Sequence, residues 1–164
     1  MISVIVDDLA LTQADAIVRP ADESLGPTSP AIASLDERAG PRFAEQRRVA
    51  SPLKAGAAVV TGSGDLAAPF VLHVVVQDRE SKAGREVIRR ALVSAWQRAT
   101  DWELGTIATP LVGADSGQLT LEEAATLLAE TFPAAANGFP TELRIVVDRD
   151  ADRALVEAIV RRIS

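Results

Sequence analysis

Few residues in this chain are suited to catalysis or metal binding, because the sequence has no cysteine and a single histidine, His73. Disulfides, thiolate catalysis, zinc–sulfur sites and imidazole metal clusters are therefore excluded. His73 lies in an apolar run, where a lone histidine is usually a packed, hydrogen-bonded core residue. The residues that remain for binding a ligand are those with carboxylates or hydroxyls, and those whose main-chain amides lie in glycine-containing stretches such as Gly113 to Gly117.

Alternating strand and helix patterns predict the layered α/β sandwich that must position these residues. We expect strands over Ile2–Val6, Ala16–Val18, Ala57–Thr61, Phe70–Val76, Thr106–Thr109 and Leu143–Val147. We expect helices over Leu35–Arg48 (broken at Gly40-Pro41), Lys82–Asp101, Leu121–Phe132 and Asp150–Ile163, and a loop over Pro133–Thr141. The two central apolar runs, 57–61 and 70–76, are typical of strands covered on both faces.

Two helices carry more detailed expectations. Thr120 and Glu123 have the spacing of a capping box at the start of the helix over 121–132. The apolar spacing of the last helix predicts that it buries four residues, which are Leu155, Ala158, Ile159 and Ile163.

The composition indicates one domain, residues 1–164, with 48% hydrophobic residues and a formal charge of −6. The negative charge makes nucleic acid an unlikely partner. The arginines between Arg38 and Arg48 are interpreted as a solvated helix face. No apolar run approaches the length of a membrane span, and the start of the chain does not resemble a signal peptide. We therefore expect no membrane association and a cytoplasmic location.

Four collinear segments resemble the macro domain family. Their sequences are Asp8-Leu9-Ala10, Val18-Arg19-Pro20-Ala21-Asp22, Ala55–Thr61 with Gly64–His73, and Pro110–Ala125. The resemblance covers almost the whole chain and implies a three-layer α/β/α sandwich with a central mixed sheet. It also implies a cleft at the strand ends that binds ADP-ribose, with two loops whose backbone amides hold the pyrophosphate.

The resemblance also assigns candidate ligand-binding residues. Asp8 and Leu9 take the adenine position, although Asp8 fits a turn cap equally well. Ala21 and Asp22 take the distal-ribose position, where an exposed turn residue is the favoured alternative for Asp22. The second phosphate loop comprises Gly113, Ala114, Asp115, Ser116 and Gly117. A turn or helix cap is favoured for Asp115; in the cleft, its carboxylate would weaken phosphate binding.

Departures from the family pattern bear on catalysis. The first phosphate loop falls on Pro27–Ile32, where two prolines lack N–H donors and Ile32 replaces an acid used by hydrolytic members. The aromatic cover of the adenine falls at or beside Val147. We therefore expect no catalytic residue, with Asp22 as the only candidate, and neither a metal nor a cofactor.

Three functions are consistent with this pattern. The favoured one is a non-catalytic binder of ADP-ribose or a related adenine nucleotide or nucleoside, so that the partner is an ADP-ribose-like small molecule or an ADP-ribosylated protein. The alternatives are a scaffold that binds a protein or another anion, and a hydrolase of ADP-ribosyl or O-acetyl-ADP-ribose bonds. The nucleotide interpretation requires residues 113–117 to form a loop close to Asp8 and Asp22.

Overall fold

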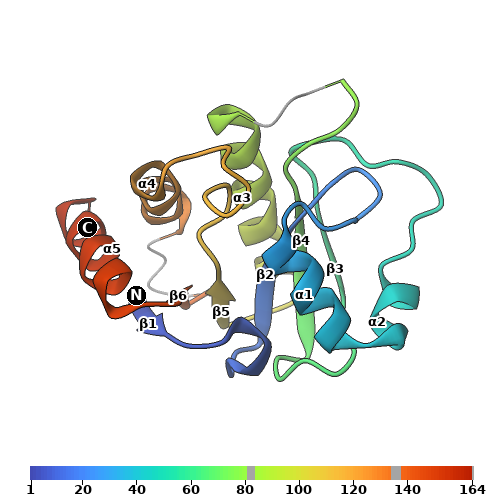
Figure 1. Cartoon of the computed structure of the whole chain (residues 1–164), viewed down its shortest axis with the longest axis horizontal. Helices are drawn as coiled ribbons and strands as arrows, with labels where there is room; N and C mark the ends of the chain where they lie inside the picture. Colours follow the sequence, from blue (N-terminus) through green and yellow to red (C-terminus); the bar gives the residue numbers. More distant parts are fainter. Residues whose placement is uncertain (81–83, 134–137, 164) are drawn as a thin grey trace.

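A computed structural model describes residues 1–80, 84–133 and 138–163 of the chain (Figure 1). The elements follow the order β1 (Ile2–Val6), η1 (Leu9–Leu11), β2 (Ala16–Ala21), α1 (Pro30–Ala39), α2 (Pro41–Gln46), β3 (Ala58–Gly62), β4 (Phe70–Val75), α3 (Arg85–Asp101), β5 (Thr106–Thr109), α4 (Leu121–Thr131), β6 (Glu142–Val147) and α5 (Asp150–Ile163). Parts of the predicted segments 82–101 and 133–141 lie outside the described residues.

The six strands form one sheet in the order β1-β6-β5-β2-β4-β3. Among the described residues, the first five strands of this order pair in parallel, and β3 runs antiparallel to β4. The predicted mixed sheet is therefore confirmed. Its parallel strands all place their carboxyl ends at one edge, where open α/β sheets usually bind ligands.

Helices cover both faces of the sheet, as Figure 1 shows, with α1 and α2 on one side and α3, α4 and α5 on the other. A hydrophobic core lies on each face of the sheet, and alternate residues of β2 point into one or the other. Ala16 and Val18 pack in the core under α3–α5, whereas Ile17 packs in the core under α1 and α2. The predicted three-layer sandwich is confirmed. No helix within the described part of the chain is long and apolar enough to cross a membrane.

Side-chain caps define the starts of α1 and α4. Ser29 caps α1 by accepting a hydrogen bond from the amide of Ile32, with Pro30 at the first helical position. Thr120 and Glu123 form the predicted capping box. The backbone and hydroxyl of Thr120 hold the pKa of the Glu123 carboxyl below its usual value.

Two predictions about burial need correction. Strand β3 is not covered on both faces, because it is an edge strand and four of its five residues are only partly buried. Helix α5 buries Val156, Ile159 and Val160, whereas Leu155 is 57% exposed and Ala158 and Ile163 are also exposed. The apolar residues of α5 cover more than one stripe, and its docking selects which stripe is buried.

The predicted break at Gly40-Pro41 is present, but α1 begins five residues before the predicted start. Gly40 has a φ of +86°, which favours glycine, and Pro41 starts α2. Ser29 followed by Pro30 is a helix-start signal that the apolar spacing alone did not reveal.

A buried polar cluster, formed by Arg19, Asp36, His73 and Thr61, lies between the sheet and the helices α1 and α2. The Arg19 guanidinium donates to both carboxylate oxygens of Asp36, at 2.7 and 2.6 Å, and contacts His73 Nδ1 at 3.1 Å. Because a guanidinium can only donate, His73 Nδ1 is the acceptor, so the ring carries its hydrogen on Nε2 and donates to Thr61 Oγ1 at 2.7 Å.

His73 is therefore a structural residue, as predicted from its apolar surroundings. Its side chain is fully buried and stacks on Phe43 of α2. Burial, followed by the positive charges of Arg19 and Arg47, lowers the pKa of His73 well below its usual value. The ring is neutral in the folded protein.

Candidate functional site

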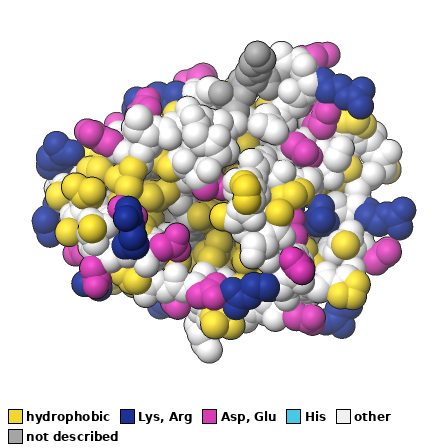
Figure 2. Space-filling view, viewed as in Figure 1, with side chains coloured by type: hydrophobic (Ala, Val, Ile, Leu, Met, Phe, Trp, Pro, Cys, Tyr) yellow, Lys and Arg dark blue, Asp and Glu magenta, His cyan; other side chains and the backbone are white. Residues whose placement is uncertain are grey.

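A cleft of about 820 Å³ opens where β1, β5 and β6 end. Its walls come from α1, from the segment after β5 and from the first turn of α5. The principal residues that line it are Val6, Asp7, Asp8, Leu9, Ala31, Ile32, Ser34, Leu35, Arg38, Pro110, Leu111, Ala114, Asp115, Leu121, Val146, Val147, Asp148, Arg149 and Asp152. In Figure 2 the molecule is hollowed in the middle of the visible face, with hydrophobic side chains at the floor and charged ones around the rim. This size and composition suit a small organic ligand.

Asp8 lies on the cleft wall and also caps the turn after the first strand. One carboxylate oxygen accepts from the amide of Ala10 at 3.0 Å and so caps η1, and the other accepts from Arg38 Nη1 at 2.6 Å. The hydrogen bond from Arg38 lowers the pKa of Asp8 below its usual value. Each ionised oxygen retains a free lone pair, so Asp8 can still accept from a ligand. Its neighbour Leu9 lines the same cleft.

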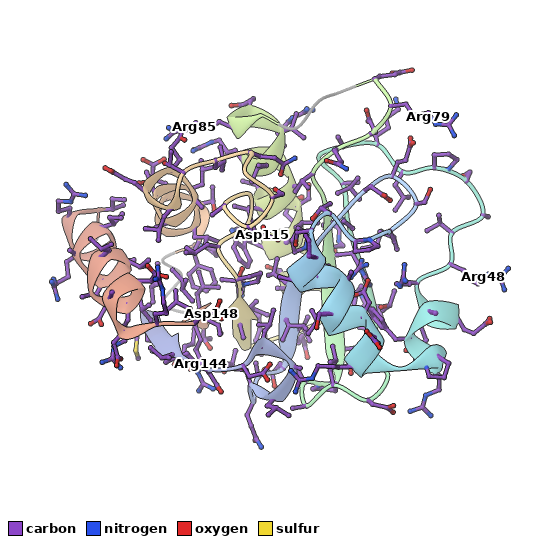
Figure 3. All side chains as sticks on the ribbon, viewed as in Figure 1. Arg48, Arg79, Arg85, Asp115, Arg144 and Asp148 are labelled. Carbon is purple, nitrogen blue, oxygen red and sulfur yellow. The ribbon has the colours of Figure 1, made fainter. Side chains whose placement is uncertain are left out.

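Asp115 also lines the cleft, together with Ala114. Its carboxylate accepts from the hydroxyl of Ser29, at 2.5 Å, across 86 residues of sequence. Figure 3 labels Asp115 close to the start of α1 and Asp148 at the end of β6. The segment after β5 and the start of α1 are thus tied together at the rim of the cleft. Asp115 stays exposed, and α4 is capped by Thr120 and not by Asp115.

The glycines of the predicted second phosphate loop have structural explanations. Gly113 is buried with a φ of +94°, and a Cβ there would lie 2.9 Å from side-chain atoms of Ile88 and Leu119. Gly117 has a φ of +76° and faces open space. The hydroxyl of Ser116 donates to Gln118 at 2.8 Å. Residues 113–117 form a succession of turns, not a helix, and of these five only Ala114 and Asp115 are among the lining residues.

Ala21 and Asp22 are not among the residues that line the cleft. Ala21 is fully buried at the end of β2. Asp22 Oδ1 accepts from the amides of Ser24 and Gly26, at 2.9 and 2.8 Å, which makes it a turn residue. The structure therefore brings Asp8 and Asp115 to one cleft without Asp22, and the turn interpretation of Asp22 describes its contacts.

Charge in the cleft is predominantly negative. Five aspartates and two arginines are among the lining residues, a formal charge of −3. Both arginines have acidic partners: Arg38 pairs with Asp8 at 2.6 Å and Arg149 with Asp152 at 3.2 Å. The described lining residues thus offer no unpaired guanidinium to a bound anion.

Several lining residues were not assigned a role from the sequence. Arg38 was interpreted as part of a solvated face, and Asp7, Asp148, Arg149 and Asp152 received no role. Asp7 follows β1, and Asp148, Arg149 and Asp152 follow β6, so their position after parallel strands is the signal that could have identified them. Arg38 reaches the cleft because of its place on α1, which periodicity does not reveal. Among the described residues no group of three or more acidic or histidine side chains is placed to hold a metal ion.

Comparison with known proteins establishes the family. The macro domain model matches residues 18–128, more than half of the chain, so the protein belongs to the macro domain family. It is 30% identical over 154 residues to a macro domain-containing protein of Streptomyces coelicolor, covering 89% of this chain and 90% of that protein. It is also 25% identical to an uncharacterized protein of Mycobacterium tuberculosis, of which the aligned region spans only 43%, against 93% of this chain.

Solved structures agree on the fold. A mutant of the Oceanobacillus iheyensis macrodomain with bound ADP-ribose superimposes with a TM-score of 0.80 at 16% identity, covering 98% of this chain and 91% of that one. The same macrodomain with ADP gives a TM-score of 0.78 at 18% identity, with coverages of 98% and 90%. These likenesses are structural and concern the fold.

Proposed function

We propose that this protein binds an adenine nucleoside or nucleotide of the ADP-ribose type, free or attached to a protein, without cleaving it. The observation that carries the proposal is the cleft at the ends of β1, β5 and β6, with Asp8 on its wall. Its volume of about 820 Å³ lies within the range of small-molecule sites. The macrodomain of Oceanobacillus iheyensis, which has the same fold, has been solved with ADP-ribose and with ADP.

Asp8 supplies polar recognition at one end of this cleft. A carboxylate with a free lone pair accepts a hydrogen bond from an exocyclic amino group such as that of adenine. Arg38 holds it ionised and in place at 2.6 Å. Next to it, Leu9 and Val147 provide apolar contact for a planar base.

Hydrolysis is disfavoured by the contacts of the candidate residues. Asp22 commits one carboxylate oxygen to two backbone amides of its own turn and is not among the lining residues. Ile32, which the resemblance aligns with the acid of hydrolytic members, lines the cleft and has no proton to exchange. Binding without bond cleavage is the function that these contacts support.

Isothermal titration calorimetry with adenosine, ADP and ADP-ribose tests the proposal. We expect adenosine to bind, and Asp8→Asn to weaken its affinity at least about tenfold, since a hydrogen bond to a charged group contributes about 1.5–3 kcal/mol. Asp101→Asn is the matched control, because Asp101 ends α3 and is not among the lining residues.

Two results would contradict the proposal. Absence of binding by all three ligands at high protein concentration would favour the scaffold function. Release of free ADP-ribose from an ADP-ribosylated protein, abolished by Asp22→Ala, would show a hydrolase.

A further inference from the structure

Asp115 is held at the start of α1 by a hydrogen bond from Ser29. Ser29 accepts from the amide of Ile32 at 3.3 Å and donates to Asp115 at 2.5 Å, so a single hydroxyl joins the carboxylate to the first turn of the helix. A helix N-terminus carries a partial positive charge that favours anions. The chain's own carboxylate therefore occupies a position that favours an anion.

The surroundings of Asp115 offer little to a second anion. Pro30, at the first helical position, has no N–H group to donate. Ser116, one residue beyond Asp115, directs its hydroxyl to Gln118 at 2.8 Å. The two arginines among the described lining residues are paired with Asp8 and Asp152. In Figure 3, Arg48, Arg79 and Arg85 lie at the periphery of the molecule, away from Asp115.

From these contacts we infer that Asp115, positioned by Ser29, is a specificity determinant that selects nucleosides without a charged phosphate over 5′-diphosphates. The inference rests on the proposed function, since it concerns the ligand class of the same cleft. A diphosphate near the start of α1 would meet this carboxylate, and the two arginines among the described lining residues are already paired with aspartates. Adenosine, which is uncharged, would not.

The ratio of ADP affinity to adenosine affinity measures this selection. We expect the wild-type protein to bind adenosine more tightly than ADP or ADP-ribose. Asp115→Asn keeps an acceptor for Ser29 but removes the charge, and should raise the ADP-to-adenosine affinity ratio at least about fivefold at low salt. In the wild-type protein the ratio should also rise with salt, because salt screens like-charge repulsion.

Ser29 acts as a positioning residue, which two further variants test. Ser29→Ala should raise the affinity ratio by less than Asp115→Asn does, because the charge remains but is no longer held at the cleft. Ser29→Thr retains the hydroxyl and should restore the wild-type ratio. Asp101→Asn removes the same charge outside the lining residues and should leave the ratio unchanged.

The outcomes separate this inference from the proposed function. Adenosine binding with an unchanged ratio in Asp115→Asn, or a wild-type preference for ADP-ribose over adenosine, would overturn the inference alone. If Asp115→Asn binds ADP and the wild-type protein binds none of the three ligands, the exclusion of diphosphates by Asp115 is supported and the proposed function of the wild-type protein is contradicted. If neither protein binds any of the three ligands, both are overturned. Thermal unfolding of each variant confirms that it is folded.

Discussion

Helix α1 contributes one charged residue to each of two regions that differ in their access to water. Asp36 belongs to the buried polar cluster, where its pair with Arg19 has side chains only 8% and 0% exposed. Arg38, two residues later, belongs to the cleft, where its pair with Asp8 has side chains 44% and 45% exposed. Both pairs have the same closest distance of 2.6 Å.

The comparison shows that the distance between two charged groups does not by itself determine how much an ion pair contributes to the stability of the fold. In the buried cluster every partner is needed, because a charge left alone there has no water to replace the lost contact. In the cleft, water and salt weaken the pair, and Asp8 keeps lone pairs that can accept from a ligand. The cluster under α1 is thus a structural element, and the cleft beside α1 is the candidate site.

The largest expected effect is that of Arg19→Ala on stability. Removal of the guanidinium leaves the Asp36 carboxylate buried, with Arg47 at 3.8 Å as its remaining cationic partner in the described part of the chain. It also takes away the donor to His73. We expect a loss of about 3–5 kcal/mol in the free energy of unfolding, measured by urea denaturation at neutral pH. A loss no greater than that of Arg38→Ala would remove the distinction between the two regions.

The pH dependence of stability sharpens the same comparison. The unfolded chain binds a proton at His73 near pH 6.5, whereas the folded protein, in which the pKa of His73 is well below that value, does not. Stability is therefore full above about pH 6.5 and falls as the pH drops toward the folded pKa. The expected slope is about 1.4 kcal/mol per pH unit.

Because His73 is the only histidine, His73→Gln should lose this slope between about pH 6.5 and 5, whatever its own stability. Urea denaturation of both proteins across this range is the measurement. An equal slope in wild type and variant would show that another group titrates.

Loss of the cap of α1 should have an intermediate effect. Ser29→Ala removes the hydroxyl that accepts from the amide of Ile32, and should cost about 1 kcal/mol of stability. Ser34→Ala is the matched control, because Ser34 is exposed within the same helix and alanine favours helix there. Equal stabilities of the two variants would show that the cap contributes nothing.

The smallest effect is expected for Arg38→Ala. Its pair with Asp8 is nearly half exposed, so the change in stability should lie within about 1 kcal/mol and diminish at high salt. Thermal unfolding at low and high salt measures it. A loss of several kcal/mol would indicate that the cleft pair is as important to the fold as the buried one.

Much of the fold was predictable because its signals are local. Residues Thr120 and Glu123 lie three apart and form their capping box wherever the helix packs. The strands over 2–6 and 106–109 were found at their observed bounds because β-branched and apolar runs mark them. The buried face of α5 was harder to predict from the sequence. Leu155 and Val156 are both apolar, and the pattern did not distinguish which of them is buried.

The site was predictable only in part. The resemblance to macro domains assigned Asp8 to the binding site, and the structure puts it on the cleft wall. Asp22 has an equally suggestive place in the sequence, but its carboxylate is directed to the amides of its own turn. A motif gives the position of a residue along the chain and not the direction of its side chain.

The sequence by itself determined the order of the strands and helices, the caps of α4 and the scarcity of catalytic groups, because periodicity, capping and composition act over a few residues. Only the tertiary structure decided that Asp115 meets Ser29 and that Arg38 meets Asp8. These contacts join segments 86 and 30 residues apart. Their formation depends on how α1 packs against the sheet, which no local pattern specifies.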